Sequence, residues 1–152
     1  MAKDLVNNVK ITTGLVPATR TADTLSSACD RQGYQSVAIL FHIGAIGDTA
    51  SGSVYAEAEL QESDDNSTYT PVANADLLFK AGRSAASGSA VGTFFQSKTT
   101  GAADTGSATY IVGYRGTKRY LKVNYNVTGT HTNGTPVAVT FVLSHADYAP
   151  AP

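Results

Sequence analysis

The chain has 152 residues and a formal net charge of -1, from 11 basic and 12 acidic side chains. This length suits one domain with a substantial core and is short for two. The balanced charge argues against a general nucleic-acid-binding protein, which usually presents a basic face. Charged residues make up only 15% of the chain, whereas about 25% is typical of soluble domains, and this composition favours strands over independent helices.

No apolar run approaches the roughly 20 residues that a membrane helix requires, so we expect no membrane association. The start, M-A-K-D-L-V-N-N, lacks the apolar core of a signal peptide, so we expect synthesis in the cytoplasm without export by a standard signal. Cys29 is the single cysteine. It excludes an internal disulfide and is expected to be a small packing residue.

The first half of the chain predicts strands. Residues 1–28 are mixed and rich in threonine, and we expect an extended arm with one or two short strands. The continuous apolar run 37–43 predicts a central strand that is buried on both faces. Residues 53–60 alternate in polarity. Their predicted inward side chains are Val54, Ala56, Ala58 and Leu60.

The second half begins with a less regular region. Asp76 to Phe79 is the one segment that predicts a short helix. Residues 81–107 are rich in Gly, Ala, Ser and Thr around Phe94 and Phe95, which predicts a flexible insertion.

The clearest pattern is a hairpin predicted over residues 110–127, in which two strand-like runs flank a tight turn at 113–118. The second run alternates, with Leu121, Val123, Tyr125 and Val127 on one face. Residues 137–144 alternate in the same way, with Val137, Val139, Phe141 and Leu143 on one face.

Short strands at turn-punctuated spacing predict an all-β fold, an antiparallel β-sandwich or barrel of jelly-roll-like form with an extended N-terminal arm. We expect the arm at 1–28 and a single β domain at 29–148, which includes the insertion at 81–107. The segment 149–152, Ala-Pro-Ala-Pro, is expected to be an exposed tail.

Patterns for catalysis and metal binding are weak. His42, His131 and His145 lack metal-ligand spacing, and His42 is expected to be a core imidazole because its strand is apolar. The acidic residues within 57–65 lack a calcium-loop pattern and are interpreted as a solvated turn. The D-T-G-S at 104–107 matches the aspartic protease signature, but no apolar strand precedes it. We therefore predict no catalytic residue, no metal ligand and no cofactor, and expect the protein not to be an enzyme.

Three blocks carry a resemblance to a known group of proteins. They are D-R-Q-G-Y-Q-S at 30–36, the block 60–78 with L-Q-E-S-D-D-N-S-T-Y at 60–69 leading towards V-A-N-A-D-L-L at 72–78, and V-G-Y-R-G-T-K-R-Y-L-K-V at 112–123. In this order and spacing the chain resembles small structural proteins of tailed bacteriophages that are often encoded among the head genes. The resemblance covers about residues 28–145, and the insertion at 81–107 is less like the group.

The resemblance implies a virion component, in particular a capsid decoration (cement) protein, made in the host bacterial cytoplasm. Such a protein binds the outer head surface and braces the major capsid protein, with homo-oligomers expected on the shell and no direct contact with nucleic acid. Edge strands and basic residues are the expected contacts. The candidate capsid-contact residues are Arg115, Lys118, Arg119, Lys122, Lys3, Lys10 and Tyr148.

Alternatives remain open at this point. The basic residues at the predicted hairpin also fit a solvated strand end. A head–tail connector or tail component fits the same resemblance. In a different class, a carbohydrate-binding adhesion module would use aromatic platforms. The candidate platforms are Tyr55, Tyr69, Tyr114 and Tyr148.

Overall fold

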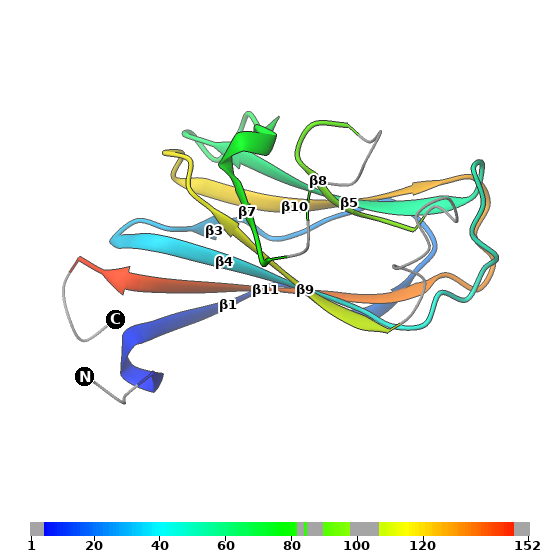
Figure 1. Cartoon of the computed structure of the whole chain (residues 1–152), viewed down its shortest axis with the longest axis horizontal. Helices are drawn as coiled ribbons and strands as arrows, with labels where there is room; N and C mark the ends of the chain where they lie inside the picture. Colours follow the sequence, from blue (N-terminus) through cyan, green and yellow to red (C-terminus); the bar gives the residue numbers. More distant parts are fainter. Residues whose placement is uncertain (1–4, 82–83, 85–89, 98–106, 148–152) are drawn as a thin grey trace.

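The computed structural model of the chain describes residues 5–81, 84, 90–97 and 107–147 (Figure 1). Its strands form two antiparallel sheets that pack face to face as two layers. This arrangement is a β-sandwich, which confirms the predicted all-β fold class. The only helical turns among the described residues are two short 3-10 helices, η1 (Val6–Asn8) and η2 (Asn74–Asp76).

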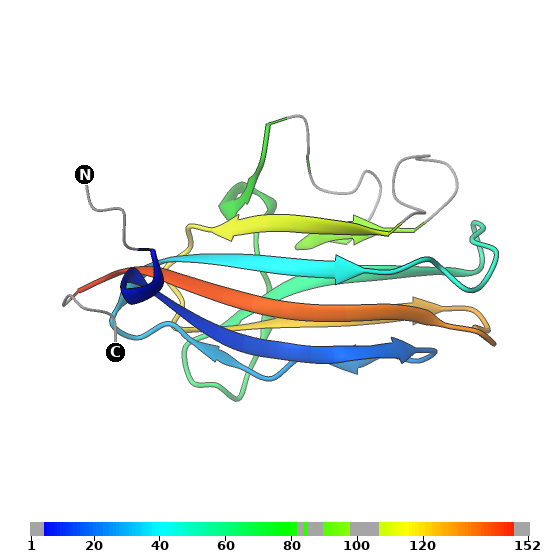
Figure 2. The same cartoon turned by 90° about the horizontal axis from the view of Figure 1, so that it is seen from below.

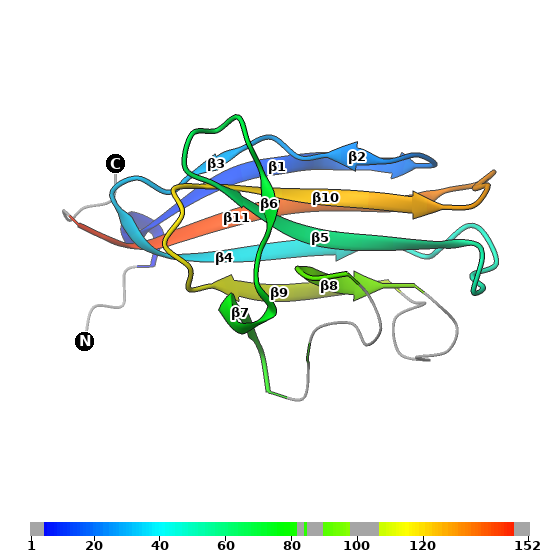
Figure 3. The same cartoon turned by 90° about the horizontal axis from the view of Figure 1, so that it is seen from above.

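One layer is a five-stranded sheet with the strand order β1-β11-β4-β9-β7. Its strands are β1 (Val9–Arg20), β11 (Thr135–Ala146), β4 (Tyr34–Ile43), β9 (Ala108–Tyr114) and β7 (Leu77–Phe79). The other layer is a six-stranded sheet centred on the pair β10 and β5 (Figure 3). Its strands are β10 (Tyr120–Thr128), β5 (Tyr55–Ser63), β2 (Thr24–Leu25), β3 (Cys29–Asp30), β6 (Thr70–Pro71) and β8 (Thr93–Gln96).

The core lies between the two sheets, where alternate residues of each long strand face inward. Phe41 of β4 lies at its centre, and four aromatic ring centroids lie 5.2 to 6.3 Å from the Phe41 ring. These rings belong to Phe94, Phe95, Tyr110 and Tyr125. The inward faces predicted for 53–60, 121–127 and 137–144 are confirmed, except that Val54 and Val127 are only half-buried.

The predicted hairpin at 110–127 is wrong, because β9 and β10 belong to different sheets. β9 pairs with β4 and β7, and β10 pairs with β5, β2 and β3. The link 115–119 therefore crosses from one layer to the other as an arch (Figure 1). A hairpin and an arch both need two strands with one apolar face each, so the alternation could not separate them.

Residues 9–20 are a full edge strand and not a free arm. β1 pairs with β11 along its length, with register shifts between Thr13 and Leu15 and between Leu15 and Ala18. These irregularities displace the period of two that would have marked a strand in the sequence. The segment 1–28 is thus extended, as expected, but its described part is built into both sheets through β1 and β2.

Two further segments differ from expectation. Residues 77–79 form the strand β7 and not a helix, because Leu77 is buried and pairs with Tyr114 of β9, so tertiary pairing overrides local propensity. The segment 81–107 contains β8, whose Phe94 and Phe95 are 4% and 0% exposed in the core. β8 therefore belongs to the domain core, whereas Val91 just before it is 54% exposed. Residues 82–83, 85–89 and 98–106 of the expected insertion lie outside the described residues.

Candidate interaction surfaces

Tyr114 holds the arch between the sheets. Its side chain is buried, and its hydroxyl donates a hydrogen bond to the Glu62 carboxylate and accepts one from the Lys118 backbone N–H at 3.0 Å. Burial, followed by the bond to Glu62, raises the pKa of Tyr114 above its usual value. A side chain at Gly116 would overlap the Tyr114 phenol, so the glycine lets the link pass directly over the ring.

The arch is also tied to the segment before β4. The Arg31 guanidinium lies over the Tyr114 ring at 5.2 Å from its centroid, and its Nε donates to the Lys118 carbonyl at 2.7 Å. Arg31, Glu62 and Tyr114 come from the three sequence blocks that carry the resemblance. The structure therefore brings those blocks together at one end of the sandwich.

Two of the candidate contact residues are engaged in ion pairs within the chain. Lys118 pairs with Asp64, and Arg119 pairs in bidentate fashion with Asp30, through contacts of 2.9 and 2.7 Å. The hydrogen bond that Arg119 donates to Asp30 lowers the pKa of Asp30, and the bond that Lys118 donates to Asp64 raises the pKa of Lys118. These pairs neutralise much of the positive charge that the sequence concentrates here.

Three other candidates form no ion pair with an acidic side chain in the described part of the chain. Arg115 donates to the Ala75 carbonyl at 3.0 Å. The ammonium groups of Lys122 and Lys10 lie over the rings of Tyr69 and Tyr34, at 4.3 and 5.8 Å. Cation–π contacts of this kind leave the ammonium charge in place.

The described candidates gather at one end of the sandwich. Val9 at the start of β1 pairs with Ser144 near the end of β11, and Tyr114 at the end of β9 pairs with Val37 near the start of β4. We call this the terminal end: the start of β1, the end of β11 and the link 115–119 (Figure 2). The remaining candidates, Lys3 and Tyr148, lie outside the described residues.

A second surface is the outer face of the five-stranded sheet. The pairings place Ile11, Val142, Ala38, Gly113 and Leu78 in one row across all five strands. The next two rows hold Thr13, Thr140, Leu40 and Ile111, and then Ala138, His42 and Thr109. None of these residues is Asp, Glu, Lys or Arg, yet Ile11, Ile111 and Leu78 are 65%, 48% and 45% exposed.

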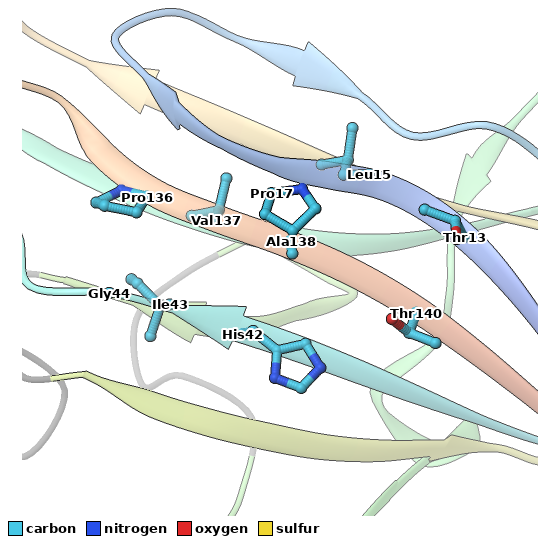
Figure 4. Close-up of a pocket in the computed structure, with 10 residues that line it drawn as sticks. All are labelled: Thr13, Leu15, Pro17, His42, Ile43, Gly44, Pro136, Val137, Ala138 and Thr140. Atoms are coloured by element: carbon cyan, nitrogen blue, oxygen red, sulfur yellow. The ribbon is translucent and has the colours of Figure 1, made fainter.

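A groove of about 420 Å³ crosses this outer face over β1, β11 and β4 (Figure 4). Ala138 is the small residue within it, and Pro17, Pro136, His42 and Thr140 stand around Ala138. His42 Nδ1 lies 3.1 Å from the Thr109 hydroxyl. His42 is therefore a half-buried surface residue, and its expected place in the core is wrong, as is the burial of 37–43 on both faces.

The outer face of the six-stranded sheet differs from this face in charge. The register of β10 and β5 places polar or charged residues there. They include Lys122, Asn124, Asn126, Glu57, Glu59 and Gln61. The sandwich thus has one outer face that carries acidic and basic side chains and one whose three central rows contain no Asp, Glu, Lys or Arg.

The remaining polar groups have structural roles. His131 is buried, with Nε2 3.1 Å from the Thr128 carbonyl and Nδ1 3.6 Å from Asp48. Asp48 accepts backbone N–H bonds from residues 132–134, which lower the pKa of its carboxyl. Cys29 is fully buried, as predicted, and burial raises the pKa of its thiol to about 12. No cluster of three or more metal-ligating side chains occurs among the described residues.

The other candidate sites are not assembled in the described part of the chain. Residues 104–106 of the protease-like motif lie outside the described residues. Of the four proposed tyrosine platforms, Tyr114 is buried, and Tyr148 is not described. Tyr55 and Tyr69 are half-buried near opposite ends of β5, since Tyr69 precedes the short strand that pairs at Glu62.

Comparisons with known proteins give no family for this chain. No protein-family model matches it, and no curated protein gives a significant match. In the residues that the structure describes, no helix has the length and apolar character needed to cross a membrane.

Proposed function

We propose that the chain is a non-enzymatic structural protein of a bacteriophage virion, and specifically a capsid decoration protein that binds the outer surface of the head. The resemblance in sequence is the basis of the phage assignment. The observation that carries the proposal is the terminal end, where the three blocks of the resemblance meet and form one braced unit. On this proposal the terminal end contacts the major capsid protein.

The physical properties of the terminal end support this role. Arg31, Tyr114 and Glu62 lock the arch by hydrogen bonds that join both sheets. A contact surface that is already rigid loses little entropy when it docks, so more of the interaction energy remains for binding. The unpaired charges of Arg115, Lys122 and Lys10 can steer and orient the protein on an acidic neighbouring surface.

Virions of the phage that carries the gene provide the test of location. Quantitative mass spectrometry should find the chain in many copies per particle, and cryo-EM should place its density on the outside of the head. Absence from the particle would overturn the proposal. A few copies confined to the tail or to the neck would overturn it in favour of a connector or tail component.

A binding assay with heads that lack the protein tests the contact surface. Arg115→Glu should weaken binding by about tenfold or more, because it replaces an attractive charge with a repulsive one. Lys80→Glu is the matched control, since Lys80 is exposed just after β7 and away from the terminal end. Equal binding by both variants would exclude the terminal end as the contact.

A further inference from the structure

We propose that the outer face of the five-stranded sheet is a homodimer interface, and that its occupant is a second copy of this chain. The inference does not depend on the proposed function. It rests on the three central rows of this face, which contain no Asp, Glu, Lys or Arg and only one titratable side chain, that of His42, and on the exposure of Ile11, Ile111 and Leu78. Contiguous exposed apolar surface of this kind marks an interaction site in a soluble protein.

The size of the face fits a stable dimer. Each strand covers a width of about 4.8 Å, and the β11–β4 pairing extends for about 30 Å. The pairing of β9 with β4 covers seven residues, and that of β7 with β9 covers three. Summed strand by strand, the face is about 600 Å² in projection, at the low end of the roughly 600–1,000 Å² per partner of a standard interface. The groove at Ala138 is a depression in this face into which a side chain of the facing copy can pack.

The chemistry of the face favours an identical partner. Homodimer interfaces are more apolar than transient ones and are depleted in charge. Recognition of a foreign partner commonly uses complementary charges for specificity, and the central rows of this face offer none. Two copies of an uncharged face can meet without burying an unpaired charge, and two sheets can pack at the usual separation of about 10 Å.

The centre of the face follows from the strand order. β4 is the middle strand, and Leu40 occupies its middle outward position, between Ala38 and His42. In a symmetric dimer each patch faces its own copy, so residues near the two-fold axis approach themselves. Leu40 of one copy should therefore lie close to Leu40 of the other.

Analytical ultracentrifugation of the purified chain tests the interface. Wild type should sediment in a concentration-dependent equilibrium up to twice the chain mass of 15.8 kDa. Leu40→Arg and Ala138→Arg should each weaken dimerisation at least about 30-fold, because each buries a charge at the interface centre. Asn124→Arg, on the outer face of the six-stranded sheet, is the matched control and should dimerise like wild type.

Cross-linking gives an independent test if the arginine variants lose their fold, as judged by circular dichroism. Leu40→Cys should form a covalent dimer with a short bis-maleimide, whereas Asn124→Cys should not. Wild type gives the background, and this should be low because Cys29 is fully buried. A wild-type monomer at every concentration, a dimer that both arginine variants leave intact, or equal cross-linking at the two cysteines would overturn the proposal. A monomer would leave the decoration test on virions unaffected.

Discussion

The substitution Tyr114→Phe should destabilise the protein, because it removes one hydroxyl that joins two parts of the arch. The Tyr114 hydroxyl accepts from the Lys118 N–H and donates to Glu62. The Lys118 N–H lies in a partly buried environment, so its loss of a partner costs about 1–3 kcal/mol. For a chain of this length each kcal/mol lowers Tm by about 2–4 °C, which gives a decrease of about 2–12 °C.

Tyr125→Phe is the matched control. Tyr125 is also buried, but its hydroxyl makes no hydrogen bond of ordinary geometry among the described residues, and only the Thr135 hydroxyl lies close enough to act on its pKa. Its removal should change stability by less than about 1 kcal/mol. Thermal and urea unfolding of both variants, followed by circular dichroism, gives the comparison. Equal losses in the two variants would refute the reasoning that the Tyr114 hydrogen bonds hold the arch.

Three further predictions concern the core and the arch. Phe95→Ala should lower the free energy of unfolding in urea by about 3–5 kcal/mol, whereas Val91→Ala, at a 54% exposed position, should lower it by less than about 0.5 kcal/mol. Similar losses in the two variants would contradict a place for β8 in the core. Gly116→Ala should lower Tm by an amount comparable to Tyr114→Phe, because the new methyl group overlaps the phenol; an unchanged Tm would contradict this close approach. Burial raises the pKa of the Cys29 thiol from 9.0 to about 12, so its contribution to stability is complete below pH 9 and falls by about 1.4 kcal/mol per pH unit between these two values. The free energy of unfolding in urea should therefore fall less between pH 8 and pH 10 in Cys29→Ala than in wild type. An equal fall in both proteins would contradict the raised pKa.

The long regular strands could be predicted from the sequence because one residue in two is apolar. β10 and β11 show this pattern with little interruption, and their inward residues are buried as expected. β1 was harder to see, since its register shifts near Gly14 break the period. β8 is only four residues long and lies in a segment rich in small residues. Its two phenylalanines alone are too short a pattern to predict a strand.

Which strands pair with one another could not be predicted from the local pattern of apolar and polar residues. Alternation in β9 and β10 specifies a core face for each strand but not which sheet each one joins. Gly113, Tyr114 and Gly116 gave the turn prediction at 113–118, yet this segment leads into an arch because Tyr114, at the end of β9, anchors the crossing. Long-range partners such as Arg31 and Glu62 decided the outcome, and these are visible only in three dimensions.

The sequence contains a signal for the outer face of the five-stranded sheet, but this signal was misinterpreted. The run 37–43 is apolar at both odd and even positions, and we expected burial on both faces. The structure shows Val37, Ile39, Phe41 and Ile43 in the core, while Leu40 is only half-buried on the outer face. A strand that is apolar on both faces has two explanations: a covering layer within the chain, or a partner outside it.

The location of the resemblance affects what it can support. Its three blocks meet at the arch, where Arg31, Glu62 and Tyr114 each make contacts that the crossing between sheets requires. Selection for this fold alone would keep these residues, whatever the protein binds. The outer-face rows contribute little to the three blocks, although they expose the apolar side chains of Ile11 and Ile111. Substitutions at Arg115 and Leu40 therefore test function more directly than substitutions within the arch, because they change what each surface can bind.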